Sequence, residues 1–223
     1  MPSDSERRDW YRDVVAGYDM VAEEYATHFF DELSHKPFDC QLLTEFSQLT
    51  PEGRICDMGC GPGHVARFLS ELGLNVLGVD ISQAMVQVAR RLNPGIVFEQ
   101  GNMLRLQFPD ASFAGIAAFY SLIHIERSGV PLALEELFRV LAPGGRLLAS
   151  FHVGEGEVHR KEFLGQDVPF HASFFGIEEM TECLTKAGFL IDETFDRPPY
   201  EFEYPSQRAY ILARKSGDLP VSR

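Results

Sequence analysis

Hydrophobic positions follow two different periods along most of the chain. From about Gly53 onward, short apolar runs typical of buried strands alternate with segments whose apolar residues recur at i, i+3, i+4 and i+7. The second spacing places those residues on one face of a helix. The predicted strands cover residues 54–58, 75–80, 96–98, 113–119, 146–153, 189–193 and 208–214, and the helical stripes cover 65–72, 85–92, 134–141 and 180–187.

Capping and turn residues separate these elements. Ser82 suits a helix N-cap, Pro131 suits a first helical turn, and Gly188 follows the end of the last stripe. Helices that each carry one apolar stripe, placed between apolar strands, predict a parallel sheet with helices on both faces. The predicted fold class is therefore a Rossmann-like, doubly wound α/β sheet.

The chain divides into segments of different character. Residues 1–50 hold two helical segments, roughly 7–33 and 38–49, that we expect to pack on the core. Residues 51–214 form the predicted main domain, which contains a long insertion without clear period at 154–176. Insertions of that length are usually functional or disordered. Residues 215–223 are predicted to be a disordered tail.

Composition and charge narrow the class of partner. The net charge is −13, from 20 Lys and Arg against 33 Asp and Glu, and a field of that sign disfavours a nucleic-acid substrate. No segment reaches the roughly 18 apolar residues of a membrane helix, so we expect a soluble, cytoplasmic protein with no membrane partner. The four cysteines form no Cys-x-x-Cys pair or zinc-ligand spacing, which predicts reduced thiols and no metal.

The most informative segment is the glycine-rich loop 57–63, which follows the first strand and opens a helix. Its glycines allow a sharp turn and let a ligand approach the backbone, while the helix offers unpaired N–H groups. Asp80 ends the second strand, 21 positions after Gly59 (80 − 59), where a carboxylate can accept hydrogen bonds from ribose hydroxyls. Loop and acid together predict an adenosine-containing ligand.

The spacing of the glycines argues against a nicotinamide dinucleotide. His64 stands where the third glycine of the Gly-x-Gly-x-x-Gly fingerprint would lie. No tyrosine is followed four residues later by lysine, the pair on which short-chain dehydrogenases rely. A nicotinamide-dependent reductase is therefore the weakest of the functions considered.

The chain resembles class I S-adenosylmethionine-dependent methyltransferases, close to the small-molecule branch that includes ubiquinone- and menaquinone-biosynthesis-type enzymes. The resemblance implies S-adenosylmethionine as cofactor, and a seven-stranded, mostly parallel sheet whose last strand is antiparallel. Related enzymes use an N-terminal helical segment as a lid, which we expect of residues 1–50, with 154–176 on the substrate side. The matching segments, in family order, are 55–63, 78–82, 101–103, 108–113 and 137–145.

The resemblance also implies roles for particular residues. Asp57 orders the glycine turn, Asp80 binds the ribose, and Asn102 accepts from the adenine amino group where the family usually has Asp. Asn102 as a plain turn residue is the alternative. Met103 covers the adenine ring. The predicted cofactor-binding set is Asp57, Gly59, Cys60, Gly61, Gly63, Asp80, Ile81, Asn102, Met103 and Tyr120.

Candidate residues for the methyl acceptor follow the fourth and fifth strands or lie in the flanking segments. His124 is the candidate general base, because a neutral imidazole is available near pH 7. The alternative is that it packs or orients backbone near the cofactor. Four further residues are candidates for contact with substrate or for the lid, with simple packing or surface exposure as their alternative: Tyr18, Tyr25, His152 and His171.

These observations predict in-line transfer of a methyl group to a small, apolar or aromatic acceptor. Phe163, Phe170, Phe174 and Phe175 give the insertion the aromatic character that such an acceptor would match. RNA or protein methylation is the alternative enzyme function, and a non-catalytic S-adenosylmethionine-binding protein is the alternative from another class. A monomer is the default state, with a homodimer as the alternative.

Overall fold

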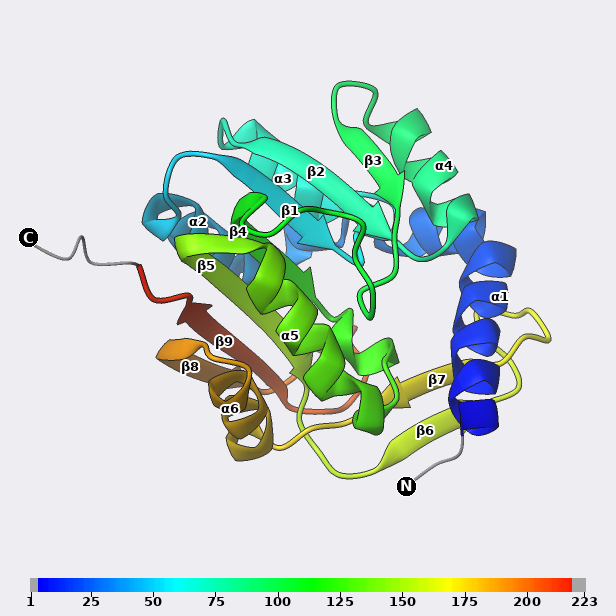
Figure 1. The fold of residues 1–223 in the computed structure, drawn as a ribbon. Helices are drawn as coiled ribbons and strands as arrows, with labels where there is room; N and C mark the ends of the chain where they lie inside the picture. Colours follow the sequence, from blue (N-terminus) through cyan, green and yellow to red (C-terminus); the bar gives the residue numbers. More distant parts are fainter. Residues whose placement is uncertain (1–3, 218–223) are drawn as a thin grey trace, which may run out of the picture.

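The computed structural model describes residues 4–217, which fold around one seven-stranded sheet (Figure 1). The strand order is β3-β2-β1-β4-β5-β9-β8. Strands β1 to β5 are parallel, and β9 runs antiparallel to both β5 and β8. The strands are β1 (Arg54–Met58), β2 (Asn75–Asp80), β3 (Val97–Gln100), β4 (Phe113–Phe119), β5 (Leu141–His152), β8 (Leu190–Arg197) and β9 (Arg208–Arg214).

Helices cover both faces of this sheet, as the single apolar stripes predicted. One face packs against α2 (Pro37–Leu49), α3 (His64–Glu71) and α4 (Gln83–Leu92). The opposite face packs against α5 (Val130–Val140) and α6 (Ile177–Lys186). The predicted doubly wound fold with an antiparallel last strand is confirmed.

The N-terminal segment forms a long helix, α1 (Asp4–Phe29), and a 3₁₀ helix, η1 (Glu32–His35), before α2 begins. The second half of α1 packs on α4 through Ala22, Ala26, Met85 and Val88. The helix runs along the edge of the molecule, past the carboxyl ends of the parallel strands (Figure 1). No helix of residues 4–217 is both long and apolar enough to cross a membrane.

The insertion 154–176 contains two strands that the sequence pattern did not predict. These are β6 (Glu157–Arg160) and β7 (Phe170–Ser173), which pair antiparallel and lie beside α1, apart from the main sheet (Figure 1). Each has four residues and β6 has no buried position, so no alternation of polar and apolar residues marks it.

The chain end is only partly described. Lys215 belongs to the predicted disordered tail, but its backbone pairs with Gly144 and Gly145, and its ammonium donates to the carbonyl oxygens of Phe138 and Leu141. The rest of that prediction, from residue 218 onward, lies outside the described residues.

Candidate active site

A cavity of about 900 Å³ opens at the carboxyl ends of the parallel strands. The ends of β1, β2, β4 and β5 form its floor, and α1, η1 and the β6–β7 pair form its walls. Parallel strands end at the same edge of a sheet, so residues far apart in sequence meet there. The volume is near the upper end of the roughly 300–1,000 Å³ range of ligand pockets.

The glycine loop forms one end of this cavity. Gly59 and Cys60 donate their backbone N–H groups to the carbonyl oxygen of Val79, which ties the loop to β2. A Cβ atom at Gly59 would lie 2.3 Å from Cβ of Ser121, so no larger residue fits. Gly61 has φ of +51° and lines the cavity with its backbone. At Gly59 and Gly61 the loop therefore presents backbone atoms, without side chains, to the cavity.

Asp80 connects this loop to the end of β2. Its Oδ2 accepts from the Gly61 N–H at 2.8 Å, and its Oδ1 accepts from the Ser82 N–H at 2.9 Å. Burial raises the pKa of Asp80 to about 6, although these backbone donors act against the rise. Asp80 is thus ionised near pH 7, and each oxygen keeps a lone pair for a ligand hydroxyl.

Three of the predicted cofactor-binding residues support the loop from behind and do not line the cavity. Asp57 is buried, and its Oδ2 accepts from the Ala66 N–H at 2.9 Å. Burial raises the pKa of Asp57 to about 7. Cys60 packs in the core, and Gly63 is the N-cap residue of α3. Their positions indicate a supporting role for the side chains of Asp57 and Cys60.

The predicted adenine end contains Ile81, Asn102 and Met103, which all line the cavity. The Asn102 Oδ1 accepts from the Leu104 N–H at 2.9 Å, a turn interaction that was the alternative role for this residue. Its amide NH₂ group has no hydrogen-bond partner among residues 4–217, and Oδ1 has a second lone pair. Both roles of Asn102 are geometrically compatible.

Tyr120 follows β4 at the floor of the cavity. Its φ of +48° is unusual for a residue with a side chain, and its N–H donates to the Ser150 carbonyl and hydroxyl oxygens. The Tyr120 hydroxyl lies 2.9 Å from that of Tyr210, which in turn donates to Asp39. The strained turn thus places the ring between cavity and core.

His124 is held in one tautomer by its neighbours. It ends a 3₁₀ helix, η2 (Leu122–His124), that follows β4. Its Nδ1 lies 2.9 Å from the carbonyl oxygen of His171, and Nδ1 carries the hydrogen because a carbonyl only accepts. Burial lowers the pKa of His124 to about 4, so the ring is neutral near pH 7. Nε2 is therefore the acceptor, and it receives the hydroxyl hydrogen of Tyr18 at 2.7 Å.

Helix α1 brings Tyr18 and Tyr25 to the cavity. Tyr25 reaches the glycine loop, where its ring lies 3.7 Å from the position of a Cβ at Gly61. Trp10, which the sequence analysis did not single out, also lines the cavity and donates Nε1–H to the His124 carbonyl oxygen at 2.9 Å. Its signal in the sequence is that it is the single tryptophan.

His171 lies behind the cavity wall and does not line the cavity. Its ring stacks on Trp10 with centroids 4.7 Å apart, and its Nε2 lies 3.1 Å from Oδ2 of Asp13. Its backbone carbonyl sets the tautomer of His124. The structure thus places His171 where it positions another residue, without direct access to a ligand in the cavity.

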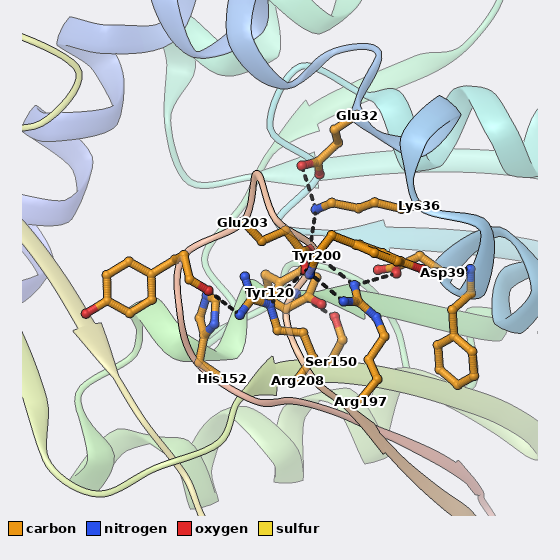
Figure 2. Close-up of polar contacts among 12 residues, drawn as sticks. Glu32, Lys36, Asp39, Tyr120, Ser150, His152, Arg197, Tyr200, Glu203 and Arg208 are labelled. Carbon is orange, nitrogen blue, oxygen red and sulfur yellow. Dashed lines mark hydrogen bonds and ion pairs between the residues drawn. The ribbon is translucent and has the colours of Figure 1, made fainter.

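A polar cluster forms the other end of the cavity (Figure 2). His152 and three charged residues that the sequence analysis missed, Lys36, Glu203 and Arg208, line this end. Glu203 forms ion pairs with Lys36 and Arg197. Burial alone would raise the pKa of Glu203, but these cations outweigh that effect and lower the pKa to about 2. Lys36 directly follows η1, Glu203 lies in the β8–β9 connection and Arg208 begins β9. No periodic pattern in these segments could predict that the three charges meet.

Comparisons with known proteins agree with this geometry. Residues 55–145 match the model of a family described as a methyltransferase domain. A probable S-adenosylmethionine-dependent methyltransferase of Mycolicibacterium smegmatis is 32% identical over 144 residues, and a demethylmenaquinone methyltransferase of Symbiobacterium thermophilum is 30% identical over 165 residues. These matches cover 63% and 66% of this chain, which spans 53% and 61% of the length of the two relatives.

A solved structure extends the similarity of fold over nearly the whole chain. It is the 1,6-didemethyltoxoflavin-N1-methyltransferase of Burkholderia thailandensis, with bound 1,6-didemethyltoxoflavin and S-adenosylhomocysteine. The two chains are 18% identical with a TM-score of 0.74, over 97% of this chain and 92% of the other. The family model and the relatives show that residues 55–145 belong to a methyltransferase domain of the class I S-adenosylmethionine-dependent type, and the solved structure shows the same fold.

Proposed function

We propose that this protein transfers a methyl group from S-adenosylmethionine to a small, planar, aromatic acceptor. One observation carries the proposal: a single continuous cavity has an adenosine-type cradle at one end and aromatic walls with two neutral histidines at the other. The cradle suits the cofactor, and the remaining space suits a second, small ligand.

The residues at the cradle fit the cofactor. Asp80 would accept from the ribose hydroxyls, Gly59 and Gly61 would meet the methionine part through bare backbone, and Met103 would cover the adenine. When bound, S-adenosylmethionine supplies a methyl group on a sulfonium, which is intrinsically reactive toward a nucleophile in line. The protein then has to align the acceptor and exclude water.

Aromatic side chains form most of the acceptor half. Tyr18 and Phe163 meet edge to face at 5.7 Å, and Phe163 and Phe170 lie 4.5 Å apart. Trp10, Phe174 and Tyr204 also line the cavity. Flat walls of this kind favour a planar ligand that stacks or packs edge to face. The net charge of −13 supports a small acceptor over a nucleic acid.

His124 remains the proposed base, and its hydrogen bond to the Tyr18 hydroxyl supports a proton route that also includes Tyr18. The lone pair of His124 Nε2 is occupied by the Tyr18 hydroxyl, so an acceptor hydroxyl or amine would first meet the oxygen of Tyr18. As the acceptor gives its proton to Tyr18 Oη, the Tyr18 hydroxyl hydrogen passes to His124 Nε2. A neutral imidazole is required for this role, and burial keeps His124 neutral.

The first experiment is calorimetric titration with S-adenosylmethionine and S-adenosylhomocysteine, with NAD as control. We expect both adenosyl ligands to bind, and Asp80→Ala to weaken them by roughly 1–3 kcal/mol because hydrogen bonds to a buried carboxylate are lost. Binding of NAD alone would contradict the proposal. A screen for methyl transfer to phenols, aromatic amines, total RNA and mixed protein then tests the acceptor class, and RNA or protein as the sole acceptor would overturn it.

The base is tested in the same screen. With an acceptor in hand, His124→Ala and Tyr18→Phe should each lower turnover, because each breaks the proton route, and Tyr18→Phe should leave the affinity for S-adenosylhomocysteine unchanged. Unchanged turnover in His124→Ala would remove His124 from this role.

A further inference from the structure

Phe163 begins a tight turn in the connection between β6 and β7, and its half-buried ring lines the cavity. The Phe163 N–H donates to the Gln166 carbonyl oxygen at 3.0 Å, and the Gln166 N–H donates to the Phe163 carbonyl oxygen at 3.0 Å. Between them, Leu164 and Gly165 have φ of +50° and +75°. Positive φ at both central residues is typical of a two-residue hairpin turn of type I′. The backbone that carries Phe163 therefore has a defined conformation.

Two residues with an unfavourable backbone contribution hold this turn against α1. Leu164 has the left-handed conformation, which is unfavourable for a residue with a side chain. Gly17 lies inside α1, where glycine is less favourable than alanine. A Cβ at Gly17 would lie 2.6 Å from the Pro169 carbonyl oxygen, so the connection reaches the α1 backbone only because residue 17 has no side chain. Both residues thus place Phe163 beside α1, and strain of this kind is concentrated at functional sites.

Four aromatic rings that line the cavity form a closed cycle around this point. The centroid of Tyr18 lies 5.7 Å from that of Phe163 and 5.0 Å from that of His124. The centroid of Phe170 lies 4.5 Å from that of Phe163 and 5.6 Å from that of His124. Phe163 therefore lies across the cycle from the proposed base. Because the Tyr18 hydroxyl binds His124 Nε2, an acceptor whose reactive atom meets the Tyr18 oxygen has its ring beside Phe163.

Phe163 also lies near the glycine loop. Its centroid is 6.3 Å from that of Tyr25, and the Tyr25 ring lies 3.7 Å from the position of a Cβ at Gly61. Phe163 is thus close both to the tyrosine of the acceptor end and to the tyrosine of the glycine loop. Transfer in line requires the acceptor atom to lie within a few tenths of an ångström of one position, so a fixed ring at this junction restricts which acceptors can reach it.

We propose that Phe163 is a specificity-determining residue that limits the size of the aromatic methyl acceptor, an inference that rests on the proposed methyltransferase function. Its ring packs on the acceptor ring and occupies the space into which a larger ring system would extend. Protein interiors are close-packed, so a larger acceptor enters only when this side chain is made smaller or moves away.

The test uses the full chain saturated with S-adenosylhomocysteine, whose binding is measured first and separately for each variant. Phenol, 2-naphthol and 4-phenylphenol are then titrated by calorimetry into the natural protein and into Phe163→Ala. We expect the affinity for at least one of the two larger phenols, relative to phenol, to rise by about tenfold or more in Phe163→Ala, because the vacated space admits the added ring. Absence of S-adenosylhomocysteine binding to the natural protein would instead contradict the proposed function.

Three results would overturn the proposal. These are an unchanged ratio of affinities in Phe163→Ala, no binding of any of the three phenols to either protein, and weaker S-adenosylhomocysteine binding in Phe163→Ala. The last result would place the action of Phe163 on the cofactor and not on the acceptor.

Phe202→Ala is the matched control, since Phe202 also lines the cavity but is 62% exposed and stacks on Tyr200. It should leave the ratio unchanged, and an equal rise would refute the assignment to Phe163.

Gly17→Ala tests the placement of Phe163 without changing a residue that lines the cavity. The added Cβ pushes the connection away from α1, so the ratio should rise although Phe163 is intact. Thermal unfolding checks that Gly17→Ala folds, and an unchanged ratio in the folded variant would contradict the proposed placement. If Gly17→Ala does not fold, Phe163→Trp carries the second test, and it should lower the ratio.

Discussion

Removal of one partner from a buried ion pair should destabilise this protein far more than removal of one from an exposed pair of similar length. Asp39 is fully buried, lies 2.8 Å from Arg197 and accepts from the Tyr210 hydroxyl. Breaking a buried pair costs about 3–5 kcal/mol. Arg197 keeps its bonds to Glu203 in Asp39→Ala, so we expect the lower end of that range, about 3 kcal/mol.

The expected loss of unfolding free energy corresponds to a decrease in melting temperature. For a chain of this size, each kcal/mol shifts the midpoint by about 2–4 °C, so Asp39→Ala should melt about 6–12 °C below the natural protein. The matched control is Asp31→Ala. Asp31 pairs with Arg67 at 3.0 Å, with the two side chains 81% and 36% exposed. An exposed pair contributes about 0–1 kcal/mol, which predicts a shift of at most about 4 °C.

Differential scanning calorimetry measures both variants under one set of conditions. If Asp39→Ala and Asp31→Ala melt at the same temperature, burial does not increase the contribution of the Asp39–Arg197 pair to stability, and the reasoning is refuted. A double variant, Asp39→Ala with Arg197→Met, separates loss of the pair from the cost of leaving Arg197 without it. Recovery of stability in the double variant would confirm that the main cost is a buried guanidinium that has lost one of its two carboxylate partners.

Three further predictions concern the cavity. Affinity for S-adenosylhomocysteine should fall as the pH drops through about 6, where the raised pKa of Asp80 lets its carboxylate protonate, and Asp80→Asn should flatten this dependence in calorimetry. Gly59→Ala should lose at least roughly 1–2 kcal/mol from its left-handed backbone, with the contact to Ser121 added, and Ser121→Gly should restore part of the stability in thermal melts. Trp10→Phe keeps a ring against His171 but loses the hydrogen bond to the His124 carbonyl oxygen, which contributes about 1 kcal/mol. Backbone hydrogen exchange in α1 should become faster by the factor that corresponds to this free energy, and unchanged exchange would contradict the prediction.

The fold was predictable because its elements carry regular apolar periods over eight or more residues or lie in short, fully apolar strands. The meeting of Gly59, Gly61 and Asp80 at one end of the cavity was predictable for a related reason, since these residues are close in sequence to the strand ends that position them. Backbone conformation at such points depends on local residues, which a sequence displays directly.

The acceptor end was not predictable in the same way. Lys36 follows η1, Glu203 lies in the β8–β9 connection and Arg208 begins β9, and these residues meet only when the sheet has formed. Strand β6 has no buried residue to mark its period, and its pairing with β7 depends on contacts with α1. His171 was expected near substrate, but it does not line the cavity, and its ring stacks on Trp10, a contact between segments about 160 residues apart.

Helix α1 forms hydrogen bonds with residues at both ends of the cavity. Asp19 accepts from the Ser82 hydroxyl at 2.6 Å beside the cofactor end, while Trp10 and Tyr18 bond to His124 near the acceptor end. A ligand at either end that favours the docked helix must, by reciprocity, strengthen binding at the other end by the same factor. Under the proposed function, a bound acceptor would therefore slow the release of S-adenosylhomocysteine, and turnover would decline at high acceptor concentration.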